Sequence, residues 1–137
     1  MRRIPQHTTL LAGTTTSRSA GWRVSDFKTV ILSINGSSAA NLKVFVKGGL
    51  SIGNEYNTSP NFKINPASRD KASAWDFIDV VDLEDNASID GDTGVDLNAN
   101  VIRNIEVNTN YLDWLAVECT ARIAGTVTVV GVGVTNQ

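Results

Sequence analysis

The stretch KTVILSINGSSAANLKVFVK, residues 28–47, contains two runs in which apolar and polar side chains alternate, joined by a segment rich in turn-forming residues. The apolar positions of one face are Val30, Leu32 and Ile34 in the first run and Leu42, Val44 and Val46 in the second. A period of two is that of a β-strand with one buried face. The connection NGSSAAN begins with Asn-Gly, a dipeptide typical of tight hairpin turns. We therefore predict two strands that pair as a β-hairpin.

The same period recurs along most of the chain, and no segment shows a convincing helical period. Further alternating runs are WDFIDVVDL (75–83), VIRNIEV (101–107), YLDWLAVECTARIA (111–124) and VTVVGVGV (127–134). Glycines at positions 131 and 133 indicate a bulge or a close approach of another segment to the backbone. Seven or eight mostly antiparallel strands separated by turns predict an all-β fold, either a β-sandwich or a jelly roll.

Residues 1–24 differ from the rest, because they lack a sustained period and are rich in Thr, Ser, Gly and Arg. We expect an extended basic N-terminal arm here, with residues 25–137 forming the β-sandwich domain. Residues 1–30 carry five basic side chains against Asp26 alone, whereas the remainder carries seven basic and thirteen acidic ones. The charge either keeps the arm soluble or lets it reach an acidic neighbour, for example another copy. The residues expected to make that contact are Arg2, Arg3, Arg18 and Arg23, with Trp22 anchoring the root of the arm.

The window WDFIDVVDLEDNASIDGDTGVDL, residues 75–97, holds eight carboxylates and no Lys, Arg or His. Such a loop suits calcium, which prefers oxygen ligands, but the spacing of an EF-hand is absent. Two carboxylates across a cleft could form a glycosidase pair, but nothing in the sequence says which two would face each other. We favour a third interpretation, in which Asp, Asn and Gly are turn residues between strands. The exposed carboxylates expected to contact a partner are then Asp85, Asp90 and Asp92.

The sequence shows few of the residue arrangements on which most enzyme mechanisms depend. The one histidine, His7, lies in the predicted arm, where no third group would hold it rigidly as a base. There is no phosphate-binding loop, no dinucleotide fingerprint and no CxxC motif. The single cysteine, Cys119, lies in a strand-like run, so we expect a small buried side chain and no disulfide. We expect a protein that is not an enzyme, with no cofactor and no metal.

Two partner classes do not fit the composition, and one remains open. The acidic body would repel phosphates, so we expect no nucleic acid. No apolar run approaches about 18 residues, so we expect no membrane span. Exposed tryptophans could bind sugars. For Trp75 and Trp114, which lie inside apolar patterns, we favour core packing.

Three stretches resemble a group of small virion proteins that are encoded among tailed-phage and prophage genes. These stretches are SDFKTVILSINGSSAANLKVFVKGGLS, WDFIDVVDLEDNASIDGDTGV and IEVNTNYLDWLAVECTARIAGTVTV, within residues 25–129. The resemblance lies in a strand followed by DLED…IDGDTG, then N…LDW and AG.VTV. It carries no catalytic residues over to this chain.

What the resemblance implies is a virion structural role, and within it that of a head decoration or cement protein. Its partners would be the major capsid protein and other copies of itself, in a homo-oligomer or lattice, without nucleic acid or membrane. It would be made in the host cytoplasm and lie on the capsid surface. A tail or head-to-tail connector component is the alternative within the virion. A carbohydrate-binding β-sandwich module is the alternative from another class.

Overall fold

The computed structural model describes residues 3–15, 17–19, 21–49, 75–98, 101–109, 112–119 and 123–136. In chain order the strands are β1 (Arg3–Thr14), β2 (Ser17–Arg18), β3 (Trp22–Arg23), β4 (Thr29–Gly36), β5 (Asn41–Gly49), β6 (Trp75–Phe77), β7 (Val80–Asp82), β8 (Ala87–Ile89), β9 (Val95–Asn98), β10 (Ile102–Val107), β11 (Trp114–Cys119) and β12 (Val127–Asn136). All the described pairings are antiparallel. There are more strands than the predicted seven or eight, because several are only two or three residues long.

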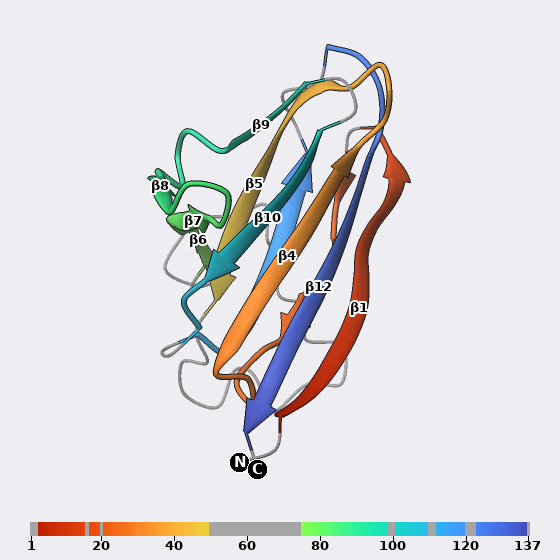
Figure 1. Cartoon of the computed structure of the whole chain (residues 1–137). Helices are drawn as coiled ribbons and strands as arrows, with labels where there is room; N and C mark the ends of the chain where they lie inside the picture. Colours follow the sequence, from red (N-terminus) through yellow and green to blue (C-terminus); the bar gives the residue numbers. More distant parts are fainter. Residues whose placement is uncertain are drawn as a thin grey trace.

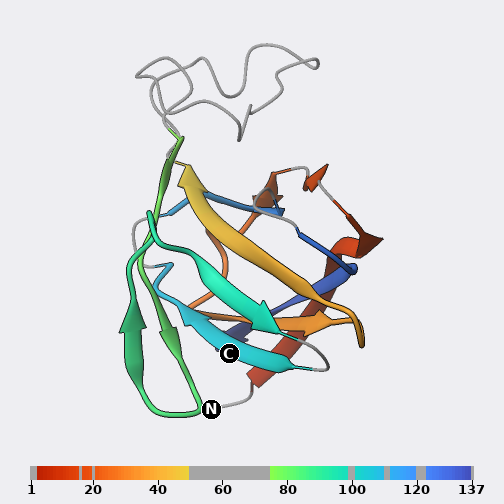
Figure 2. The ribbon, with the colours of Figure 1, turned by 90° about the horizontal axis from the view of Figure 1, so that it is seen from above.

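The strands form two facing sheets, so the predicted all-β sandwich is confirmed (Figures 1 and 2). The first sheet has the order β1-β12-β4-β10-β7-β8. The second has the order β2-β11-β5-β6, with β3 also pairing with β11 and β9 with β5. In the described part of the chain there is no helix that is long and apolar enough to cross a membrane.

The strands β4 and β5 do not form the predicted hairpin. β4 pairs with β10 and β12 in the first sheet, and β5 pairs with β6, β9 and β11 in the second. The Asn-Gly pair forms no tight turn, because Asn35 and Gly36 continue β4 and pair with Thr128 and Val127. The reversal comes later, where the Ala40 N–H donates to the Ser37 carbonyl (3.0 Å). The connection is therefore an arch between sheets.

The arch places the two apolar faces identified in the sequence against each other. All six side chains are buried, with exposed fractions of 0–2%: Val30, Leu32, Ile34, Leu42, Val44 and Val46. Ile105 of β10 and Val117 of β11 extend this core within the two sheets. Cys119 is also fully buried in it, as predicted for a small apolar side chain. Each sheet thus contributes one apolar face to a single core.

The glycines at 131 and 133 admit two aromatic rings to the inner face of β12. A Cβ on Gly131 would lie 2.4 Å from Cζ3 of Trp22, and one on Gly133 would lie 2.5 Å from Cδ2 of Phe27. The two rings contact each other, with centroids 5.3 Å apart. The predicted close approach is therefore confirmed. The alternative, a bulge, is absent from the register of β12 with β4, which is regular.

The N-terminal segment is extended, as expected, but it is not an arm separate from the domain. β1 pairs with β12 along its whole length, and β2 and β3 pair with β11 in the other sheet. The division between residues 1–24 and 25–137 is thus not a structural boundary. The physical reason is that an irregular edge strand needs no alternating pattern. β1 has register shifts between Thr9 and Leu11 and between Leu11 and Thr14, which interrupt the period of two.

The acidic run WDFIDVVDL was predicted as one strand, but the structure divides it between the sheets. β6 pairs with β5, and β7 pairs with β10. Residues 78–79 between them belong to neither strand. The predicted strand at 111–124 is shorter, since β11 ends at Cys119 and Ile123 is 78% exposed. Residues 54–70 contain Pro60, Pro66 and several turn-forming residues, so the sequence predicts a long surface loop there, and this segment lies outside the described residues.

Replacing Gly131 by Ala should destabilise the fold, because the added methyl group would overlap the Trp22 ring. Overpacking of this kind typically lowers the free energy of unfolding by about 1–3 kcal/mol. Urea unfolding followed by far-UV circular dichroism measures it. The double variant Trp22→Leu/Gly131→Ala should lose less than the sum of the single variants, because leucine leaves room for the methyl group. Strictly additive losses would show that the two residues do not oppose each other.

Candidate interaction site

The acidic window forms two turns, and their carboxylates cap backbone N–H groups. In the first turn, Asp82 accepts a hydrogen bond from the Glu84 N–H (3.0 Å) and Asp85 accepts one from the Ala87 N–H (2.9 Å). Asn86 has a φ of 59°, a left-handed conformation that asparagine tolerates well. The resulting β7–β8 hairpin shows why the sequence uses Asp and Asn here, and the interpretation as turn residues is confirmed.

The second turn, between β8 and β9, is built in the same way. The Asp90 carboxylate accepts from the Asp92 N–H (2.9 Å), and its carbonyl accepts from the N–H groups of Thr93 and Gly94 (3.0 and 3.1 Å). Asp79 fixes the start of the turn by accepting from the Gly91 N–H (2.8 Å). Side-chain bonds of this kind make a loop of carboxylates self-supporting.

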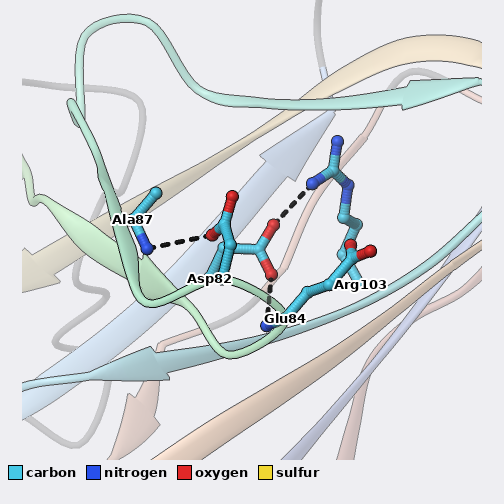
Figure 3. A network of polar contacts seen from close by, with 5 residues as sticks. Asp82, Glu84, Ala87 and Arg103 are labelled. Carbon is cyan, nitrogen blue, oxygen red and sulfur yellow. Dashed lines mark hydrogen bonds and ion pairs between the residues drawn. The ribbon is translucent and has the colours of Figure 1, made fainter.

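Two carboxylates of the window form ion pairs with cations from other strands. Asp82 is 3% exposed and pairs with Arg103 of β10, with 2.5 Å between Oδ2 and Nη1 (Figure 3). Asp96 pairs with Lys43 of β5 at 3.5 Å, and this pair is more exposed, with 61% of the Asp96 and 36% of the Lys43 side chain accessible. Sequence reasoning missed both pairs, because the window itself contains no cation. The register between distant strands is what brings them together.

The two turns border an open cleft of about 310 Å³. Its charged lining is formed by Asp82, Asp85, Asp90, Asp96 and Arg103. Asp85 and Asp90, both predicted contact residues, are thus brought to one cleft. Asp92 does not line it but lies exposed on the second turn.

Two of the predicted basic contact residues, Arg18 and Arg23, lie at the edge of the second sheet opposite β6. Arg18 is exposed on β2, opposite Glu118 in the register. Arg23 is exposed on β3 and donates from Nε to the Ser25 hydroxyl (3.1 Å). In Figure 2 the short strands β2 and β3 lie at the upper right, on the side of the sandwich away from the green β7 and β8 at the left. Arg2 and the side chain of Arg3 lie outside the described residues.

Trp22 lies between the two sheets, as an anchor of the N-terminal segment would. Its backbone pairs with Leu115 in the second sheet, while its ring covers Gly131 of the first. The side chain is half-buried. Trp114 is half-buried too, but it does not belong to the core cluster of the described residues, so its predicted core role is not confirmed. The side chain of Trp75 lies outside the description.

A buried ion pair occupies the outer face of the second sheet. Lys47 Nζ lies 3.5 Å from Glu118 Oε1, and their side chains are 3% and 9% exposed. The ammonium group also lies 4.6 Å from the centroid of the Phe77 ring. The alternation of β5 correctly places Lys47 on the outer face, but it does not reveal that this part of the face is covered. Pairing with a carboxylate and an aromatic ring offsets the loss of hydration.

Among the described residues there is no group of three or more His, Cys, Asp or Glu side chains that could hold a metal ion. His7 is exposed on β1 and pairs with Val132 in the register. Asp85, Asp90 and Asp92 are exposed on the two acidic turns.

Neither a scan of protein-family models nor a search of curated proteins finds a match to this chain. Among solved structures, a two-sheet fold of the same kind occurs in a prophage-derived protein. That structure is the crystal structure of the SPBc2 prophage-derived protein YomS, with a TM-score of 0.70. The alignment covers 98% of this chain and 96% of that chain at 15% sequence identity. The likeness shows that the two proteins share a fold.

Replacing Asp82 by Ala should lower the free energy of unfolding by about 1–3 kcal/mol, because Arg103 and the Glu84 N–H would both lose a buried partner. Asp96→Ala is the matched control. It removes an exposed pair, whose loss typically changes stability by less than about 1 kcal/mol. Thermal unfolding of the two variants tests the difference. Equal stabilities would show that the Asp82 pair does not support the first turn.

Proposed function

We propose that this chain is a structural protein of a phage virion, and within the virion a decoration or cement protein of the capsid. The fold shared with a prophage-derived protein over nearly the whole chain supports the virion role. The separation of charge across the sandwich supports the finer role, since a cement protein must bind charged neighbours through its edges. In this role the protein acts by binding and not by catalysis.

The charge separation rests on where the described side chains lie. The window at residues 75–97 carries eight carboxylates, and Arg103 and Lys43 form ion pairs with two of them. The opposite side presents Arg18 and Arg23. Opposite charges at two edges favour one orientation of approach to a charged neighbour and penalise the reverse orientation.

On a capsid, the acidic turns would contact basic groups of capsid subunits or the basic edge of the next copy. The carboxylates of the turns are held by their own hydrogen bonds, so little side-chain freedom is lost when a cation binds. Each such contact is weak, but many copies bound at once on a lattice stabilise it strongly. The protein would be made in the host cytoplasm and lie on the capsid surface.

The copy number in purified particles tests the proposal most directly. Quantitative mass spectrometry against the major capsid protein should give a count on the order of hundreds, as expected of a component that repeats with the capsid lattice. A count of about six or twelve, as in a cyclic ring, would place the protein in the tail or connector. Absence from the particle would overturn the virion role.

Removing charge from the acidic turns should weaken attachment to capsids by about three- to tenfold, and the remaining binding should depend less on salt. The variant is Asp85→Asn/Asp90→Asn, because asparagine keeps the Oδ1 acceptors of both turns while losing the charge. Asp26→Asn is the control, since Asp26 is exposed outside the turns. Co-sedimentation with depleted capsids measures attachment. Equal effects of both variants would contradict a specific role of the acidic turns.

A further inference from the structure

The outer face of the first sheet is nearly free of charge. Register places outward side chains of β1, β12, β4 and β10 in continuous rows, because directly opposed residues share a face. Glu106 is the only charged side chain that points outward from the following parts of these four strands: residues 5–9, 128–134, 29–35 and 102–106. Figure 1 views this face, and no described strand crosses in front of it.

Apolar side chains form the middle of this face. Val130, Val132 and Val134 point outward from β12, because their neighbours Val129, Gly131 and Gly133 face the core. Ile31 lies beside Val132 on β4, and Ile102 on β10 is 61% exposed. The solvent face of an antiparallel sheet normally alternates to polar residues. Depletion of charge around apolar side chains is instead typical of the centre of a protein–protein interface.

We infer that a second copy of this chain docks on this face, about a two-fold axis that runs parallel to the strands between β12 and β4. One row of the register reads His7, Val132, Ile31 and Glu106. Rotation about this axis reverses the row in the partner copy. Val132 then meets Ile31, and His7 meets Glu106, whose carboxylate can accept a hydrogen bond from the imidazole.

Charge and area both favour a second copy as the occupant. The protein carries a net charge of -2 and its acidic turns would repel one another, whereas this face can meet itself without opposing like charges. Four strands about 4.8 Å apart and about seven residues long cover on the order of 450 Å² per copy. Two such faces bury about 900–1,000 Å² in all, close to the smallest specific interfaces, so the dimer should be weak. It would form whether or not the protein belongs to a virion.

Sedimentation equilibrium of the full chain should show a monomer–dimer equilibrium. Concentrations up to about 300 µM are needed, because small interfaces often bind in the micromolar range. Ile31→Lys should weaken association at least about tenfold, because the ammonium group would be desolvated in the interface. Ile123→Lys is the matched control, because Ile123 is exposed outside this face. This variant should dimerise like the unmodified chain. Thermal unfolding confirms that both variants are folded.

A charge exchange tests the axis itself. His7→Glu and Glu106→Lys should each weaken the dimer, and the double variant should restore it. Within one copy the two residues are three strand spacings apart, about 14 Å, which is too far for a direct pair. Restored association therefore reports a contact between copies. A chain that stays monomeric, or a dimer unaffected by Ile31→Lys, would overturn the inference. Loss in the single variants without recovery in the double variant would overturn the proposed axis.

Discussion

The fold depends on one constraint, that two apolar strand faces adjacent in the sequence must be buried against each other. β4 and β5 meet it by lying in opposite sheets, joined by the arch at residues 37–40. A hairpin would have left both faces on one side of one sheet. The segment just before β12 holds the arch in place. The Ser37 N–H donates to the Thr126 carbonyl, and the Asn41 N–H donates to the Ala124 carbonyl. The arch thus connects the two sheets, and the other strands lie on either side of β4 and β5 within them.

The arch also shows how far the sequence could predict the structure. Alternation identifies β4, β5, β10, β11 and β12 as strands and gives the buried faces of β4 and β5 correctly, because burial on one side imposes a period of two. It does not give the buried face of β12, where Gly131 and Gly133 face the core and the valines between them point outward. It cannot say which strands pair, since Val30 is equally well buried in a hairpin or across a sandwich. The role of residues 3–14 was hidden for a related reason. Their pairing depends on backbone hydrogen bonds to β12, which leave little trace in side-chain chemistry.

The N-terminal segment packs into space that two glycines leave on the inner face of β12. Gly131 and Gly133 leave the inner face of β12 bare, and the rings of Trp22 and Phe27 fill that space. The sequence indicated a close approach at these glycines, but not which side chains make it. The acidic window was predicted in a similar, partial way. Turn chemistry follows from local sequence, whereas Arg103 and Lys43 reach the window only through strand register.

The surface divides into regions with different charge, and the division constrains how copies can meet. The acidic turns and the basic residues Arg18 and Arg23 lie at opposite edges, while the outer face of the first sheet is nearly neutral. Contact between opposite edges is heterologous and need not close, whereas a face that meets itself closes after two copies. A molecule with both kinds of contact would join dimers into extended arrays. That geometry suits a protein that covers a lattice better than one that acts as an isolated monomer.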